Sequence, residues 1–144
     1  MNKKWYRTKP LPSDIASRLD QLSSLFEAEG VLVAYIFGSL AQQREGNDVD
    51  LALLLPLDQP VYLLREKLSA VLGTERIDIV DLSRANNVLR FEIISTGRCL
   101  FAANDELRLD FELETVRIYH DREVPRRRQE AVLRERVAWL SNEI

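Results

Sequence analysis

The chain has 144 residues, of which 46% are hydrophobic and 30% are charged, with five glycines and five prolines. This composition is typical of one folded domain and not of a disordered segment. The net charge of −3 argues against direct nucleic-acid binding, and the single Cys99 can form no internal disulfide. No apolar run approaches the length of a membrane span or a signal core, so we expect a cytoplasmic protein without a membrane partner.

The first half of the chain predicts a helix followed by two strands. After Pro12-Ser13-Asp14, apolar residues at three- and four-residue spacing predict one helix that ends at Gly30. The nearly continuous apolar residues from Val31 to Phe37 predict a strand that is covered on both faces. A short polar helix over 40–45 and a second strand, Asp48 to Leu55, are expected next.

The second half predicts four helices and two strands. Periodicity and the Gly and Pro residues place them at residues 60–72, 75–82, 84–95 and 99–102, from 104 onward, and after a break at Val124-Pro125. Ser83 is the expected N-cap of the helix over 84–95. In the helix that begins at 104, Leu109, Leu113 and Val116 have the spacing of a buried stripe.

Two aspartates at the start of the second strand are the first candidates for chemistry. Successive strand side chains point to opposite faces, so Asp48 and Asp50 share one face. They follow the turn Gly38-Ser39, whose backbone N–H groups can bind phosphate oxygens. Carboxylates are the ligands that hard divalent cations prefer. Gly38-Ser39 alone could be an ordinary turn, and Asp48 and Asp50 alone could mark a solvated strand boundary. Because the turn and the aspartates follow each other within one short stretch, we favour a site for a metal and a polyphosphate.

A third aspartate, Asp78, lies in the otherwise apolar strand over 75–82. Burying an unpaired carboxylate is costly, and that cost disappears beside a bound cation. We therefore expect Asp78 to join Asp48 and Asp50. The alternative is an ordinary surface aspartate on an exposed strand face.

The residues Gly38-Ser39, Asp48 and Asp50-Leu51 resemble the signature of the nucleotidyltransferases of the DNA polymerase β-like superfamily, in their small, stand-alone form, the minimal nucleotidyltransferases (MNT). The spacer between Ser39 and Asp48 is shorter than usual, and Gln43 stands where glycine is frequent. These departures affect the phosphate loop and leave the candidate metal ligands intact.

The resemblance implies an α/β fold of the polymerase β palm-like nucleotidyltransferase type. Such a fold has a small mixed β-sheet flanked by helices. We divide the chain into a nucleotidyltransferase core, 1–103, and a helical C-terminal extension, 104–144. The extension belongs to the same compact domain, and we expect it to dock a partner.

The resemblance also implies a reaction, in which a nucleoside monophosphate is transferred from ATP and pyrophosphate is released. Asp48 and Asp50 would bind two Mg²⁺ ions together, and Asp78 would complete one metal site and act as general base. Gly38 and Ser39 would hold the β- and γ-phosphates.

The acceptor is suggested by the whole chain, which resembles the MNT antitoxins encoded beside HEPN-domain ribonuclease toxins. This implies that AMP is transferred to a tyrosine hydroxyl of the cognate HEPN toxin, which is thereby neutralised. Two alternatives remain: an aminoglycoside-like adenylyltransferase with a small-molecule acceptor, and a non-catalytic antitoxin that acts by binding. The Arg-rich segment over 122–136 is interleaved with acidic residues, which favours a solvated helix face over a nucleic-acid docking surface.

Overall fold

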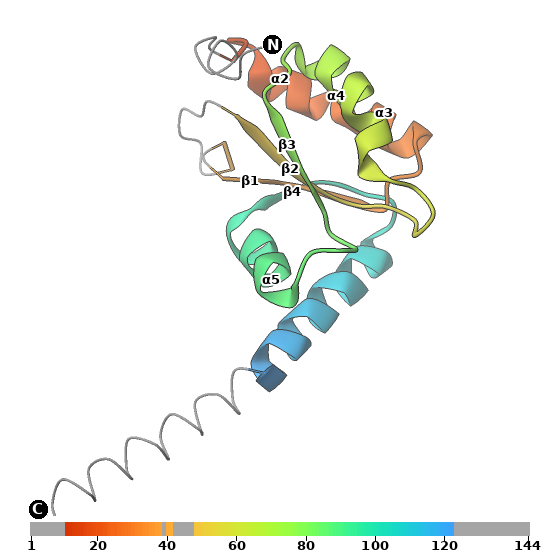
Figure 1. The fold of residues 1–144 in the computed structure, drawn as a ribbon, viewed down its shortest axis with the longest axis vertical. Coiled ribbons are helices and arrows are strands. Elements are labelled where there is room, and N and C mark those ends of the chain that lie inside the picture. Colours follow the sequence, from red (N-terminus) through yellow and green to blue (C-terminus); the bar gives the residue numbers. More distant parts are fainter. Residues whose placement is uncertain (1–10, 39, 42–47, 123–144) are drawn as a thin grey trace, which may run out of the picture.

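The computed structural model describes residues 11–38, 40–41 and 48–122. In this part of the chain, four strands form a mixed sheet with helices on both faces (Figure 1). The strand order is β3-β2-β1-β4, and the strands are β1 (Val33–Phe37), β2 (Val49–Leu54), β3 (Ile77–Asp81) and β4 (Arg98–Ala102). Strand β1 is antiparallel to β2 and β4, whereas β2 and β3 are parallel. The predicted small mixed sheet flanked by helices is confirmed.

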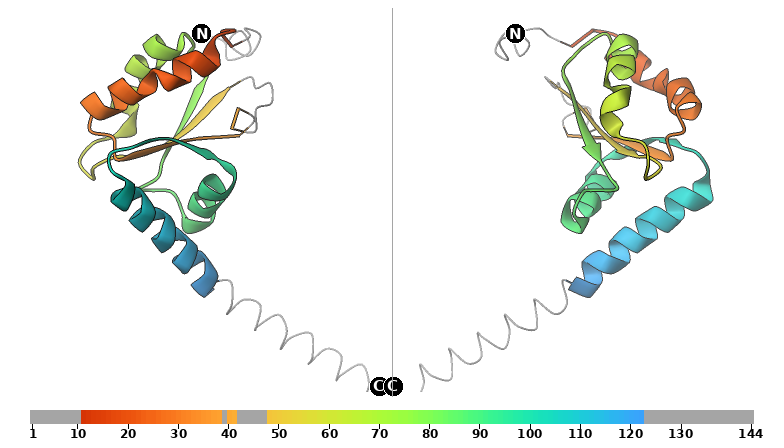
Figure 2. Two further views of the ribbon diagram at one scale, coloured as in Figure 1. Left: turned by 180° about the vertical axis from the view of Figure 1, so that it is seen from behind. Right: turned by 45° about the vertical axis from the view of Figure 1, so that its right-hand side comes forward.

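One face of the sheet is covered by the helices that precede β1 and β3 (Figures 1 and 2). These elements are α2 (Ile15–Asp20), α3 (Leu22–Ala28), the 3-10 turn η1 (Val61–Leu64) and α4 (Arg65–Leu72). The prediction of a single helix before β1 was wrong, because the helix divides at Gln21. There the backbone N–H of Gln21 donates to the Arg18 carbonyl at 3.2 Å, a tight i to i−3 bond that ends α2.

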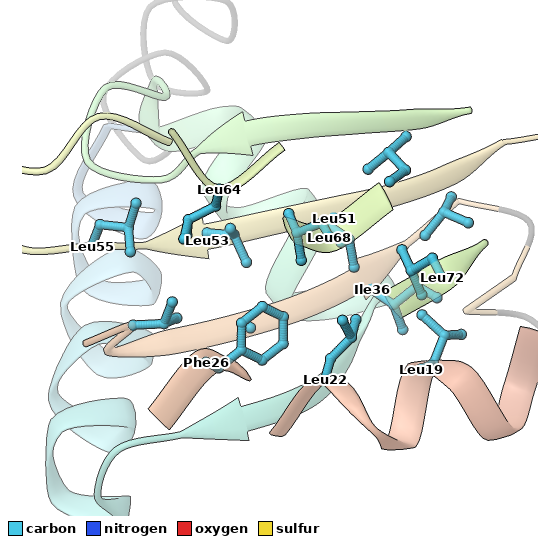
Figure 3. Close-up of a cluster of buried hydrophobic side chains, with 14 residues drawn as sticks. Leu19, Leu22, Phe26, Ile36, Leu51, Leu53, Leu55, Leu64, Leu68 and Leu72 are labelled. Carbon is cyan, nitrogen blue, oxygen red and sulfur yellow. The ribbon is translucent and has the colours of Figure 1, made fainter. Parts of the chain in front are cut away.

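The space between these helices and the sheet is filled by leucine-rich side chains (Figure 3). The fully buried members include Leu22, Phe26, Ile36, Leu51, Leu53, Leu68 and Leu72. Burial of one such side chain contributes about 1.5–3 kcal/mol. A slip of β2 by one residue would move Asp50 into this core and Leu51 out of it, so the core fixes the register of β2.

The other face of the sheet is covered by α5 (Asn87–Thr96) and by the C-terminal helix, which is described over 105–122 (Figures 1 and 2). The prediction that Ser83 caps α5 was wrong. The N-cap is Asn86, whose Oδ1 accepts from the backbone N–H of Leu89 at 2.9 Å. The Ser83 hydroxyl instead donates to Asp81 Oδ1 at 2.6 Å, so it closes the turn after β3.

The C-terminal helix presents a different face to the sheet from the one predicted. Leu109 and Leu113 are 54% and 58% exposed, whereas Phe111 and Thr115 are buried. Polar partners explain this orientation, since the hydroxyl of Tyr35 on β1 donates to Glu112 Oε1 at 2.7 Å. The predicted leucine stripe was therefore wrong. None of the helices in the described ranges is long and apolar enough to cross a membrane.

Candidate active site

The three aspartates lie at the end of the sheet where β1 ends and β2 and β3 begin. Asp50 pairs with Phe37 of β1 on one side and with Asp78 of β3 on the other. Paired residues on neighbouring strands lie about 4.8 Å apart, and their side chains share a face. Val49 and Ile77 are buried in the leucine-rich core, so the aspartates point to the opposite side. The parallel register thus brings two carboxylates side by side, with Asp48 two residues before Asp50.

Burial and neighbouring carboxylates both act on Asp50. Burial, the charge of Asp78, a hydrogen bond with Asp78 and the charge of Asp48 together raise the pKa of its carboxyl to about 6. Loss of hydration disfavours the ionised form of Asp50, and so do the like charges of the carboxylate cluster. Such a cluster is stabilised by a proton or by a bound cation.

Gly38 follows β1 and lies against the Asp50 carboxylate. Its φ is +73°, in the left-handed region, and a Cβ at this position would lie 2.3 Å from Asp50 Oδ2. Glycine is therefore required here both by the backbone conformation and by the closeness of the carboxylate. Ser39 and residues 42–47 lie outside the described residues, so the phosphate contacts of Ser39 and the short helix over 40–45 stay predictions.

Asp48 stands just before β2, and its side chain is 48% exposed. Its Oδ1 lies 3.5 Å from Nε of Arg76, a buried arginine just before β3. The backbone carbonyl of Arg76 accepts from the N–H of Val49 at 2.8 Å. Arg76 was not among the site residues predicted from the sequence. The available signal was its spacing, because a residue two positions before Asp78 points to the same face of a strand.

The donor set fits divalent cations by its chemistry. Among the described residues, no three His, Cys, Asp or Glu side chains are gathered closely enough to hold a metal ion as they stand. Asp50 and Asp78 interact directly, whereas Asp48 is engaged with Arg76. Asp48 is half exposed, and exposed side chains change rotamer within nanoseconds, so a cation can draw its carboxylate toward the other two. The three carboxylates supply the oxygen ligands that Mg²⁺ prefers.

This sheet, with its carboxylates at the end where the parallel strands begin, has the architecture of a nucleotidyltransferase domain. The family model described as "Polymerase beta, Nucleotidyltransferase" matches residues 20–106. Because this range is more than half of the chain, the chain belongs to this family. The range contains Asp48, Asp50 and Asp78. No curated protein sequence matches the chain significantly.

Toxin–antitoxin complexes are among the solved structures that share this fold. A chain of a toxin–antitoxin complex with AMP-PNP is 25% identical, with a TM-score of 0.62, and the match covers 76% of this chain and 92% of that chain. A mutant MntA–HpeT toxin–antitoxin complex gives 24% identity, a TM-score of 0.62 and the same coverage. A complex of a tri-AMPylated HEPN toxin from Shewanella oneidensis with an MNT antitoxin gives 23% identity and a TM-score of 0.60, covering 78% and 92% of the two chains. The predicted resemblance to the minimal nucleotidyltransferases is confirmed.

Proposed function

We propose that this chain is a Mg²⁺-dependent protein adenylyltransferase that transfers AMP from ATP to a tyrosine hydroxyl of a cognate HEPN ribonuclease toxin and thereby neutralises the toxin. The observation that carries the proposal is the in-register pair Asp50 and Asp78 beside Gly38, at the end of a nucleotidyltransferase sheet. Because the sheet register sets this pair, it is a property of the fold and not of a loop.

In the proposed reaction, the tyrosine oxygen attacks the α-phosphorus of ATP, the bond to the β-phosphate breaks, and pyrophosphate leaves. Asp48, Asp50 and Asp78 hold two Mg²⁺ ions, which when bound offset the charge of the triphosphate and favour the ionised form of the acceptor hydroxyl. Asp78 is exposed and receives the proton of that hydroxyl as general base. Gly38 and Ser39 hold the β- and γ-phosphates through backbone N–H groups and the serine hydroxyl.

A folded protein is the acceptor class that suits the site best. The side chains of Asp48 and Asp78 are open to solvent, so a large substrate can approach them without entering a closed pocket. The toxin as partner is supported by the matched toxin–antitoxin complex with AMP-PNP, and the HEPN class and the tyrosine come from the resemblance of the whole chain. We assign docking of the toxin to the extension 104–144, whose described part exposes Leu109 and Leu113. Apolar side chains of this kind form the centres of protein interfaces.

Intact-protein mass spectrometry tests the proposal. The chain is incubated with ATP, Mg²⁺ and its proposed HEPN partner, sought as the protein encoded beside it, in parallel with the double variant Asp48→Asn, Asp50→Asn. We expect AMP-sized mass increments on the HEPN protein with the wild-type chain and none with the variant. If the HEPN protein forms a stable complex with the chain but its mass stays unchanged, the proposal is overturned in favour of inhibition by binding. An unmodified HEPN protein that forms no complex would redirect the search to a small-molecule acceptor.

A further inference from the structure

We propose that Arg76 is a positioning residue, which restrains the carboxylate of Asp48 near Asp50 and Asp78, so that a short movement brings it to a cation bound there. This inference deepens the proposed function and rests on it. It names a residue that lies outside the predicted set of ligands and that acts through one of them.

Arg76 is unusual because its charge is inside the protein. Its side chain is only 5% exposed, although it belongs to the residue class that is most often solvated. A guanidinium loses much hydration when it is buried, so a buried arginine needs oppositely charged or hydrogen-bonding neighbours. One of these neighbours is the Asp48 carboxylate, at 3.5 Å from Nε.

The backbone of Arg76 also acts on Asp48. The Arg76 carbonyl accepts the N–H of Val49, the residue that follows Asp48, at 2.8 Å. Asp48 itself precedes β2 and has no partner in the ladder between β2 and β3, whose pairs begin at Val49. Among the described residues, the Arg76 guanidinium therefore restrains the half-exposed carboxylate of Asp48, whose backbone lies just outside the ladder between β2 and β3.

The ion pair itself contributes little to fold stability, because the Asp48 side chain is half exposed. The positive charge of Arg76 favours a site that contains Asp48, Asp50 and Asp78, because it reduces the repulsion among the three carboxylates. A carboxylate has two oxygens with several lone pairs, so Asp48 can contact the guanidinium and a cation together. Groups that orient metal ligands in this way typically contribute 10–100-fold to metal affinity or activity.

The test uses the full chain and Mn²⁺ as the probe, with binding measured by electron paramagnetic resonance. The variants are Arg76→Met, which removes the charge at similar length, and Arg76→Lys, which keeps the charge without the planar fork. Arg65→Met is the matched control, because Arg65 donates to the Ile77 carbonyl at 2.8 Å and so also contacts β3. We expect the Mn²⁺ dissociation constant to rise roughly 10–100-fold in Arg76→Met, less in Arg76→Lys, and not in Arg65→Met.

A second readout separates positioning from a merely structural role. In the AMP-transfer assay, Arg76→Lys should raise the Mg²⁺ concentration needed for half-maximal rate while the KM for ATP changes little. The double variant Arg76→Met, Asp48→Asn should bind Mn²⁺ no more weakly than Asp48→Asn alone, because the two residues act as one unit.

The outcomes distinguish failure of the inference from failure of the proposed function. Wild-type Mn²⁺ affinity in a folded Arg76→Met variant would overturn the inference. It would also be overturned if the double variant Arg76→Met, Asp48→Asn lost as much Mn²⁺ binding free energy as the two single variants together. If Arg76→Met does not fold, Arg76→Lys decides by the same two measurements. Failure of the wild-type chain to bind Mn²⁺, or wild-type affinity in Asp48→Asn, would overturn the proposed metal site and the inference with it.

Discussion

Replacement of Gly38 by alanine should damage catalysis far more than stability. A methyl group at this position would lie 2.3 Å from Asp50 Oδ2, which is about 1 Å inside the ~3.5 Å optimum for non-bonded atoms. The contact is with a carboxylate on a buried strand, so either the carboxylate or the turn must move by roughly that amount. A misplacement of about 1 Å in a catalytic site can lower the rate roughly 100-fold. The left-handed φ of +73° adds about 1–2 kcal/mol of strain for a residue with a side chain.

Gly73 provides the matched control for this variant. It ends α4 with a φ of +69°, so alanine at Gly73 carries the same backbone strain. Its added methyl group would meet Nη1 of Arg18 at 2.5 Å, which is the far end of a flexible side chain that can swing away. The two variants should therefore lose similar stability, about 3–8 °C in Tm. Only the variant at Gly38 disturbs a candidate metal ligand.

The assay is AMP transfer at saturating ATP and Mg²⁺, together with thermal unfolding in EDTA. We expect Gly38→Ala to transfer AMP roughly 100-fold more slowly than wild type, and Gly73→Ala to remain within about twofold. Equal rates in the two variants would refute the argument that Gly38 is required because its backbone lies against the Asp50 carboxylate.

Three further predictions concern stability. In EDTA, the free energy of unfolding of the wild-type chain should fall as the pH rises from about 4 to about 6, because folded Asp50 keeps its proton up to about pH 6 and the unfolded group loses it near 3.8. Asp50→Asn should lack this pH-dependent component and melt higher than wild type at pH 7.5. The same pH profile in Asp50→Asn as in wild type would contradict the raised pKa of Asp50. Tyr35→Phe, which removes the 2.7 Å bond to a carboxylate of the C-terminal helix, should cost about 1.5–3 kcal/mol in urea unfolding, whereas Tyr62→Phe on the surface should cost almost nothing. Phe111→Ala should lower the free energy of unfolding by about 3–5 kcal/mol and Leu113→Ala by less than about 0.5 kcal/mol. The reverse order would indicate that Leu109 and Leu113 face the core.

The direction of Asp50 in β2 could be predicted from sequence because the information is local. Val49, Leu51 and Leu53 alternate with polar or small residues, so only one register buries the apolar set. The same local logic placed the end of α4 at Gly73, since a left-handed residue commonly ends a helix. Neither inference needs knowledge of what lies across the sheet.

Features that depend on partners distant in the chain were missed. The Leu109 and Leu113 spacing is helical, but the helix turns its other face inward because Glu112 reaches the Tyr35 hydroxyl across 77 positions of sequence. The contact between Arg76 and Asp48 depends in the same way on the register of the parallel pair β2 and β3. Periodicity predicts which face of a helix or strand can be apolar, but it does not predict which polar side chains contact each other.

In the proposed function, the carboxylates at the end of the sheet catalyse nucleotidyl transfer. The most direct measurement compares ATP labelled at the α-phosphorus with ATP labelled at the γ-phosphorus, using the proposed HEPN partner as acceptor and Asp50→Asn as the control enzyme. Label should reach the acceptor from the α-position only, and Asp50→Asn should transfer almost none. Transfer of the γ-label, or undiminished transfer by Asp50→Asn, would contradict nucleotidyl transfer by these carboxylates.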